Sequence, residues 1–80
     1  MTPPDQTLDA RGLKCPLPIL KARKALNAMQ PGQTLAVLAT DPGSVRDFQA
    51  FCRATGDALL DQVTDAGEYR FLLQKGGGSR

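Results

Sequence analysis

Apolar and polar residues follow different spacings in six short blocks of this chain. Alternation with a period of two and compact apolar runs predict strands, whereas apolar spacing of three or four residues predicts helices. Turns that contain glycine or proline separate the blocks, as at Arg11-Gly12 and at Gly56. The predicted strands are residues 6–10, 34–40, 58–64 and 69–75, and the predicted helices are residues 16–29 and 44–55.

These blocks follow one another in the order βαβαββ. A chain with two helices and a single core is predicted to form a two-layer α/β (α+β) sandwich, in which both helices pack on one face of a four-stranded mixed sheet. Residues 6–75 form one predicted domain. Residues 1–5 are predicted to be a flexible N-terminus, and residues 76–80 a flexible glycine-rich tail.

The composition restricts the chemistry that the chain can perform. Its 80 residues include two Cys and no His. The missing His excludes a Ser-His-Asp or Cys-His catalytic pair within the chain, and also a His-ligated zinc or haem site. Two Cys are too few for a four-cysteine zinc or iron–sulfur site, so no metal site is predicted. Covalent chemistry is therefore expected to use a thiol.

The sequence gives no indication of export or membrane insertion. Residues 1–5 contain neither the cation nor the apolar segment of a secretory signal. The longest apolar stretch, residues 35–39, is five residues long and too short to span a bilayer. We therefore expect a cytoplasmic protein in a reducing compartment, without a membrane partner.

The net charge of +2 hides an uneven distribution. Residues 10–40 contain five cations and no acid, whereas residues 41–75 contain four cations and six acids. The positive charge is thus concentrated around Cys15. One interpretation is a solvated helix face, and the other is a patch that attracts an acidic partner and favours a thiolate.

Cys15 stands at the predicted start of the first helix. Pro16 and Pro18 follow it, and prolines are tolerated there because the first amides of a helix have no intrahelical partner. If Pro16 is the first helical residue, Cys15 lies at or next to the N-cap. Gly12, in the turn ahead of the helix, is expected to have a structural role.

The surroundings predicted for Cys15 favour its thiolate. The thiol lies at the positive end of the helix macrodipole, and the amides of Leu17 and Ile19 remain to face it. Lys14 and Arg11 lie nearby in the sequence. We therefore expect the pKa of Cys15 to lie below its ordinary value, and a persulfide on Cys15 to be held as an anion. The alternative is that Cys15 is a small buried hydrophobic residue.

The first helix has two predicted faces. The side chains expected to face the core are Ile19, Ala22, Ala25, Leu26 and Met29, and those expected on the other side are Leu17, Leu20, Lys21 and Lys24. Leucines beside cations, next to a reactive thiol, indicate a docking surface for a protein partner. The alternative is incidental exposure of leucine, which is common.

Cys52 is interpreted differently, because it lies on the predicted buried face of the second helix. That face consists of Val45, Phe48, Phe51, Cys52 and Thr55. Cys52 is therefore expected to be a structural thiol in the core. Two alternatives stay open, a resolving thiol for Cys15 in a thiol redox protein and a second sulfur site.

Residues 8–18, which contain a Cys-Pro-x-Pro motif, resemble the opening motif of the TusA/SirA sulfur-carrier family. Further matching runs lie at residues 29–35, 41–42, 46–47, 51–52 and 69–71. These later matches favour the TusA branch. The resemblance covers residues 6–75 and implies a two-layer βαβαββ sandwich.

The resemblance also implies a role as a sulfur carrier, or sulfurtransferase. Cys15 would accept sulfane sulfur as a persulfide from a cysteine desulfurase or a rhodanese-like donor, and pass it to a Cys of an acceptor protein. The implied end point is tRNA 2-thiouridine; the alternatives are dissimilatory sulfur oxidation and molybdenum-cofactor maturation. The chain would act as a relay rather than as a turnover enzyme and need no cofactor beyond the persulfide. We expect Arg46 to join the outer face of the first helix in docking.

Two further classes of function stay open. An RNA-binding or regulatory module could use the basic stretch. The four aromatic residues lie outside that stretch and the net charge is low, so no strong nucleic-acid binding is expected. A ubiquitin-like sulfur carrier would need a free C-terminal glycine, whereas Ser79 and Arg80 follow residues 76–78 here.

Overall fold

The computed structural model describes residues 3–77 of the chain. Its elements are β1 (Gln6–Ala10), α1 (Leu17–Asn27), β2 (Thr34–Ala39), α2 (Ser44–Thr55), β3 (Ala58–Asp65) and β4 (Glu68–Gln74). The predicted βαβαββ order is confirmed, and the predicted bounds of β1 and α2 agree with the structure. Residues 1–2 and 78–80, which belong to the predicted flexible ends, lie outside the described residues.

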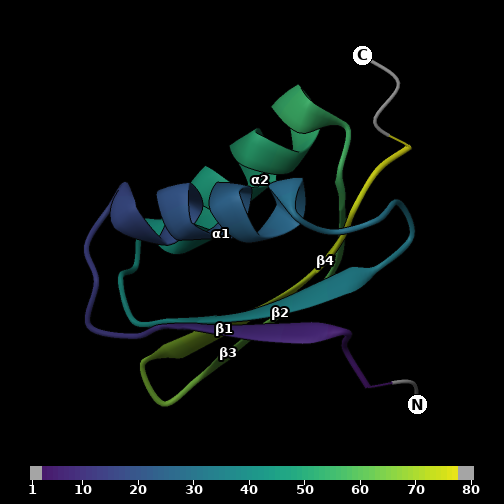
Figure 1. Cartoon of the computed structure of the whole chain (residues 1–80). Helices are drawn as coiled ribbons and strands as arrows, with labels where there is room; N and C mark the ends of the chain where they lie inside the picture. The colour runs from purple at the N-terminus through teal and green to yellow at the C-terminus, as the bar shows by residue number, and fades with distance from the viewer. Residues whose placement is uncertain (1–2, 78–80) are drawn as a thin grey trace.

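The four strands form one mixed sheet in the order β1-β2-β4-β3. β1 pairs with β2 in parallel, and α1 makes the crossover that a parallel pair requires. β4 pairs antiparallel with both β2 and β3. The two helices cover the same face of this sheet (Figure 1), which confirms the predicted two-layer sandwich.

The turn between β3 and β4 confirms the predicted hairpin. Its two central residues, Ala66 and Gly67, both have positive φ, at 52° and 82°. Positive φ at both positions is typical of a turn whose twist matches that of the flanking strands. Gly67 adopts this conformation without strain, whereas Ala66 is a non-glycine residue in the left-handed region.

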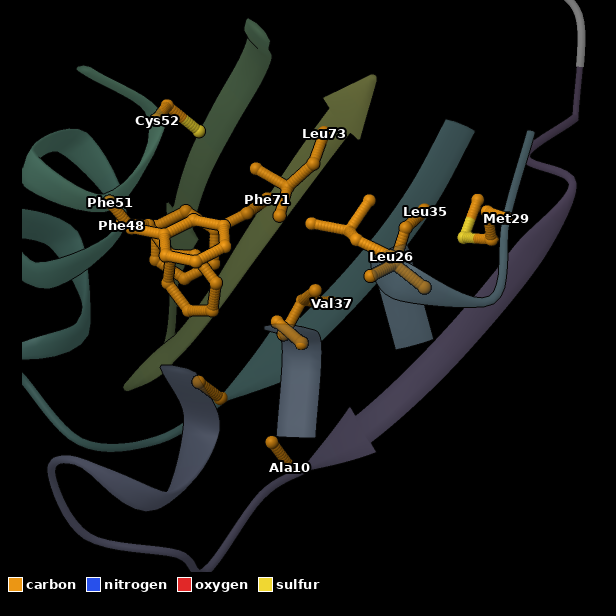
Figure 2. Packing of buried hydrophobic residues seen from close by; sticks show 12 residues of the cluster. Ala10, Leu26, Met29, Leu35, Val37, Phe48, Phe51, Cys52, Phe71 and Leu73 are labelled. Carbon is orange, nitrogen blue, oxygen red and sulfur yellow. The ribbon is translucent and has the colours of Figure 1, made fainter. Parts of the chain in front are cut away.

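The core lies between the helices and the sheet (Figure 2). The Phe48 ring of α2 packs on Phe71 of β4 with 4.6 Å between ring centroids, and on Phe51 with 6.4 Å. Burial alternates along β2, because side chains of a strand point to opposite faces. The buried apolar residues are Ala10, Ala22, Leu26, Met29, Leu35, Val37, Ala39, Phe48, Phe51, Cys52, Phe71 and Leu73.

The two predicted faces of α1 are confirmed. Ala22 and Leu26 are buried, and Ile19 and Ala25 pack against the core while half-buried. Leu17 and Leu20 lie on the outer side with 45% and 53% of their surfaces exposed. Pro18, the second of the two prolines at the predicted helix start, is also buried.

Both ends of the described chain are hydrogen-bonded to the domain. The Asp5 amide donates to the Thr34 carbonyl at 3.0 Å, and the Thr34 amide donates to the Asp5 carboxylate at 2.8 Å. The Gly76 amide donates to the Asp57 carboxylate at 2.8 Å. A Cβ on Gly76 would lie 2.6 Å from the Gly56 carbonyl oxygen, so this close approach requires glycine.

Within residues 3–77, neither helix is long and apolar enough to cross a membrane.

Candidate functional site

Cys15 lies in the loop between β1 and α1. Because β1 and β2 are parallel, their carboxyl ends meet at one edge of the sheet, and the loops that follow them lie side by side. A hydrogen bond joins these loops, from the Gly12 amide to the Thr40 hydroxyl oxygen at 2.9 Å. Gly12 has a φ of 83°, which supports its predicted structural role in the turn.

The start of α1 differs in detail from the prediction. The helix begins at Leu17, Pro16 is the N-cap, and no side chain caps the helix. Cys15 therefore directly precedes the N-cap, as expected, but Pro16 is one position earlier than predicted. The Cys15–Pro16 peptide bond is cis. The Leu17 amide donates to the Lys14 carbonyl at 2.8 Å, so the prediction that it faces the thiol is wrong.

Two carboxylates lie next to the Cys15 thiol. The sulfur of Cys15 and carboxylate oxygens of Asp41 and Asp47 all lie within 4.8 Å of one another. A hydrogen bond to Asp47 is the main cause that raises the pKa of Cys15, with burial and the charges of Asp47 and Asp41 adding to it. The predicted lowering of this pKa is therefore wrong, because acids rather than cations set the local charge.

Arg11 has other partners than the thiol. Its guanidinium forms ion pairs with Asp9 at 2.9 Å and with Glu68 at 3.3 Å. The hydrogen bonds from Arg11 are the main cause that lowers the pKa of Asp9 to about 2. The expected role of Arg11 and Lys14 in stabilising the thiolate is wrong, because neither cation is among the groups that shift the pKa of Cys15.

Two shallow hollows flank Cys15, and both Cys15 and Asp47 line each of them. The first, of about 530 Å³, is the α2 hollow, and the second, of about 330 Å³, is the interhelix hollow. The α2 hollow is lined by Cys15, Pro42, Gly43, Val45, Arg46, Asp47 and Gln49. The interhelix hollow is lined by Cys15, Pro16, Ile19, Arg23, Asp47, Ala50 and Phe51. Arg46 and Ile19, both predicted site residues, thus each line one of the two hollows beside the thiol.

The outer face of α1 carries the other predicted docking residues. Leu17, Leu20, Lys21 and Lys24 are all exposed. Lys21 and Lys24 line an apolar hollow of about 370 Å³ together with Leu8, Ala25 and Ala28. Leu17 follows the N-cap directly, so this face begins beside Cys15.

Cys52 is buried, as predicted, with 7% of its surface exposed. Its thiol lies near the side chains of the core (Figure 2). Burial is the main cause that raises the pKa of Cys52 to about 11, with a smaller effect of the Asp57 charge. Both cysteines are free thiols, and only Cys15 is exposed.

Cys15, Asp41 and Asp47 are also spaced closely enough to ligate one metal ion. A thiolate with two carboxylates combines soft and hard ligands. Acidic side chains at a protein surface are common without a metal, and the expectation of no metal site stays a prediction.

The interpretation of the sequence missed Asp41 and Asp47 as neighbours of the thiol. Both residues follow β2, and the parallel βαβ order places the loop after β2 beside the loop after β1. The βαβαββ order was itself predicted, so the sequence already indicated that Asp41 lies near Cys15. Asp47 lies in the first turn of α2, facing back toward this edge.

The fold and this site define a class of small two-layer α/β proteins with one exposed thiol at a helix start. A family model described as "Sulfurtransferase TusA" matches residues 6–75. This chain belongs to the TusA family.

Relatives of known name and structure agree with this assignment. The chain is 58% identical over 71 residues to the "Sulfur carrier protein TusA" of Allochromatium vinosum, covering 89% of this chain and 93% of that protein. It is also similar to the crystal structure of a SirA-like protein from Desulfitobacterium hafniense, with a TM-score of 0.77 and 27% identity. That match covers 89% of this chain and 97% of the other. The protein is therefore a sulfur carrier of the TusA type, and its role implies sulfur donor and acceptor partners.

Proposed function

We propose that Cys15 carries sulfane sulfur as a persulfide. The sulfur comes from the persulfide of a cysteine desulfurase or a rhodanese-like donor and passes to a Cys of an acceptor protein. The observation that carries this proposal is the contrast between the thiols: Cys15 is exposed at the start of α1, whereas Cys52 is buried. An exposed thiol on a small rigid domain can approach the thiol of another protein directly.

The transfer needs no cofactor in this chain. The Cys15 thiolate attacks the outer sulfur of the donor's Cys–S–SH group, the S–S bond of the donor breaks, and the donor Cys leaves as a thiolate. The product is Cys15–S–SH. The acceptor Cys repeats the same exchange on this persulfide and returns Cys15 to the thiolate. No oxidant is consumed in either step, and because the attacking group is already a thiolate, neither step requires a His as base.

We propose the outer face of α1 and Arg46 as the partner surface. Leu17 and Leu20 offer apolar contact area, and Lys21 and Lys24 offer positive charge beside it. Arg46 borders the α2 hollow at the thiol itself. This combination suits transient partners with acidic and apolar surfaces, since charge accelerates encounter more than it tightens binding.

The end point of the relay is tRNA 2-thiouridine. A protein with this role works in the cytoplasm. The support is the similarity to the TusA branch, which extends beyond the Cys-Pro-x-Pro motif through nearly the whole chain. Sulfur oxidation and molybdenum-cofactor maturation are the competing end points. Labelled sulfur from the loaded carrier should enter tRNA when the tRNA-thiolating acceptor proteins are supplied, and an absence of labelled tRNA would favour the competing end points.

The carrier role itself is tested by loading. The protein is incubated with a cysteine desulfurase and cysteine, and its intact mass is measured with and without reductant. We expect a gain of about 32 Da, one sulfur atom, that reductant removes. Cys52→Ser should load as the wild type does and Cys15→Ser should not load. A gain that survives in Cys15→Ser would contradict the proposal.

A further inference from the structure

The charged residues around Cys15 come from four places in the fold. Asp41 precedes α2, and Asp47 and Arg46 lie in its first turn. Arg23 of α1 lines the interhelix hollow, and Lys14 precedes Cys15 in the chain. The carboxylates of Asp41 and Asp47 are the groups within 4.8 Å of the sulfur and of each other.

The cations around this site do not neutralise the two carboxylates. Within residues 3–77, neither Asp41 nor Asp47 forms an ion pair; the pairs there join Arg11 to Asp9 and Glu68. The Arg23 guanidinium lies over the Phe51 ring, 5.2 Å from its centroid. The carboxylate of Asp47 is therefore available to a cation from outside the chain, at a place that both hollows open to solvent.

We propose that Asp47 is a specificity-determining residue of sulfur transfer: its carboxylate lowers the thiolate fraction of Cys15 in the free carrier, and a partner raises that fraction by pairing a Lys or Arg with Asp47. This proposal deepens and rests on the proposed persulfide relay. Its basis is the position of the Asp47 carboxylate, which lies within 4.8 Å of the Cys15 sulfur and can accept a hydrogen bond from it only while the sulfur is protonated. The raised pKa of Cys15 agrees with it.

The chemistry of the release is a deprotonation followed by the exchange already described. A cation beside Asp47 weakens the negative potential at the sulfur, so the thiol gives up its proton to solvent more readily. The thiolate then attacks the donor's outer sulfur, and the donor's leaving thiolate takes up a proton. A small persulfide that brings no cation meets the protonated thiol instead, so the free carrier exchanges sulfur slowly with it.

The protonation part is tested by alkylation, which needs no sulfur transfer. The rate of Cys15 modification by iodoacetamide is measured against pH for the wild type, Asp47→Asn and the matched control Asp41→Asn. We expect Asp47→Asn to lower the midpoint of the profile and to speed alkylation at pH 7 about three- to tenfold, with a smaller change for Asp41→Asn. Asp47→Ser, with the fold of each variant checked by circular dichroism, guards against a local distortion specific to Asn. An unchanged or raised midpoint in both Asp47 variants overturns the proposal.

The specificity part is tested with two sulfur donors. Uptake is followed by mass from glutathione persulfide, which offers no Lys or Arg, and from a persulfidated cysteine desulfurase. Asp47→Asn should take sulfur several-fold faster from glutathione persulfide, and equally fast or more slowly from the desulfurase. Equal acceleration with both donors overturns the specificity role. If the wild type takes sulfur from neither donor, the carrier proposal and this role fail together, while the alkylation profile still decides whether Asp47 holds the proton.

Discussion

The two cysteines of this chain differ in what raises the pKa of their thiols. Burial in the core is the main cause that raises the pKa of Cys52, whereas a hydrogen bond to Asp47 is the main cause at the exposed Cys15. Desolvation by the core lasts as long as the domain is folded. A neighbouring carboxylate can be neutralised by another molecule without any change of fold. The comparison teaches that the pKa of a thiol can be fixed by the fold in one region. In another region it can depend on a neighbouring group that other molecules can reach.

The largest expected effect concerns the reactivity of the two thiols. In the native protein Cys15 should react with iodoacetamide faster than Cys52 by a factor on the order of a thousand, because Cys52 must first be exposed by local opening. Peptide mapping after a timed reaction measures both rates. The difference should collapse in denaturant. Comparable native rates would show that Cys52 is not protected and would reopen a role for it in redox chemistry.

A substitution in the core and one on the outer face of α1 should differ in their effect on stability. Phe48→Ala removes the ring that packs on Phe71 and Phe51, and should lower the free energy of unfolding by about 3–5 kcal/mol. Leu20→Ala, on the exposed side of α1, should change it by less than about 0.5 kcal/mol. Urea unfolding followed by circular dichroism gives both values. A large loss in Leu20→Ala would mean that this face is stabilising rather than free for docking.

Replacing the buried thiol by a hydroxyl tests the structural role of Cys52. Cys52→Ser should lower the free energy of unfolding by about 1–3 kcal/mol. The hydroxyl group would lose hydrogen bonds to water when it is buried in the apolar core. Sulfur loading at Cys15 should stay at the wild-type level in the folded variant. Cys15→Ser is the matched control, with a stability within about 0.5 kcal/mol of the wild type. A loss of loading in folded Cys52→Ser would contradict a purely structural role.

The smallest expected effect concerns Arg11. Arg11→Gln should change the alkylation rate of Cys15 by less than about twofold, since the ion pairs of Arg11 are with Asp9 and Glu68. The same variant should raise the pKa of Asp9 from about 2 toward its ordinary value, as an NMR titration would show. The Asp9 pair contributes stability above the ordinary carboxyl pKa and loses it as the pH falls through the lowered one. A marked change in alkylation would restore Arg11 as a neighbour of the thiol.

Most of the fold could be predicted from the local pattern. The bounds of β1 and α2 agree with the predictions because glycine breaks mark their ends, as Gly56 does at the end of α2 with a φ of 84°. The hairpin turn and the buried face of α2 could likewise be predicted from residues that are close together in sequence. The position of Cys15 before α1 followed from the two prolines. These features depend on interactions within one element or one turn.

The electrostatics of the site could not be predicted in the same way. The cations near Cys15 in the sequence, Arg11 and Lys14, are not the groups that shift the pKa of its thiol. Asp47, more than thirty residues later, comes next to the sulfur through the pairing of β1 with β2. A charge count along the chain therefore gave the wrong sign for the pKa shift of Cys15. The position of Asp47 beside Cys15 follows from the three-dimensional arrangement rather than from proximity in sequence.

The hydrogen bonds at the two ends of the described chain have a practical consequence. Asp5 binds Thr34 at the start of β2, and the Gly32 amide donates to the Lys75 carbonyl nearby. Cys15 lies by the other end of β2, so both described ends leave the domain on the side away from the thiol (Figure 1). A fluorophore, a solid support or a second domain attached at either end would leave the sulfur open to its partners. The domain is thus suited to tethered assays in which the thiol stays accessible.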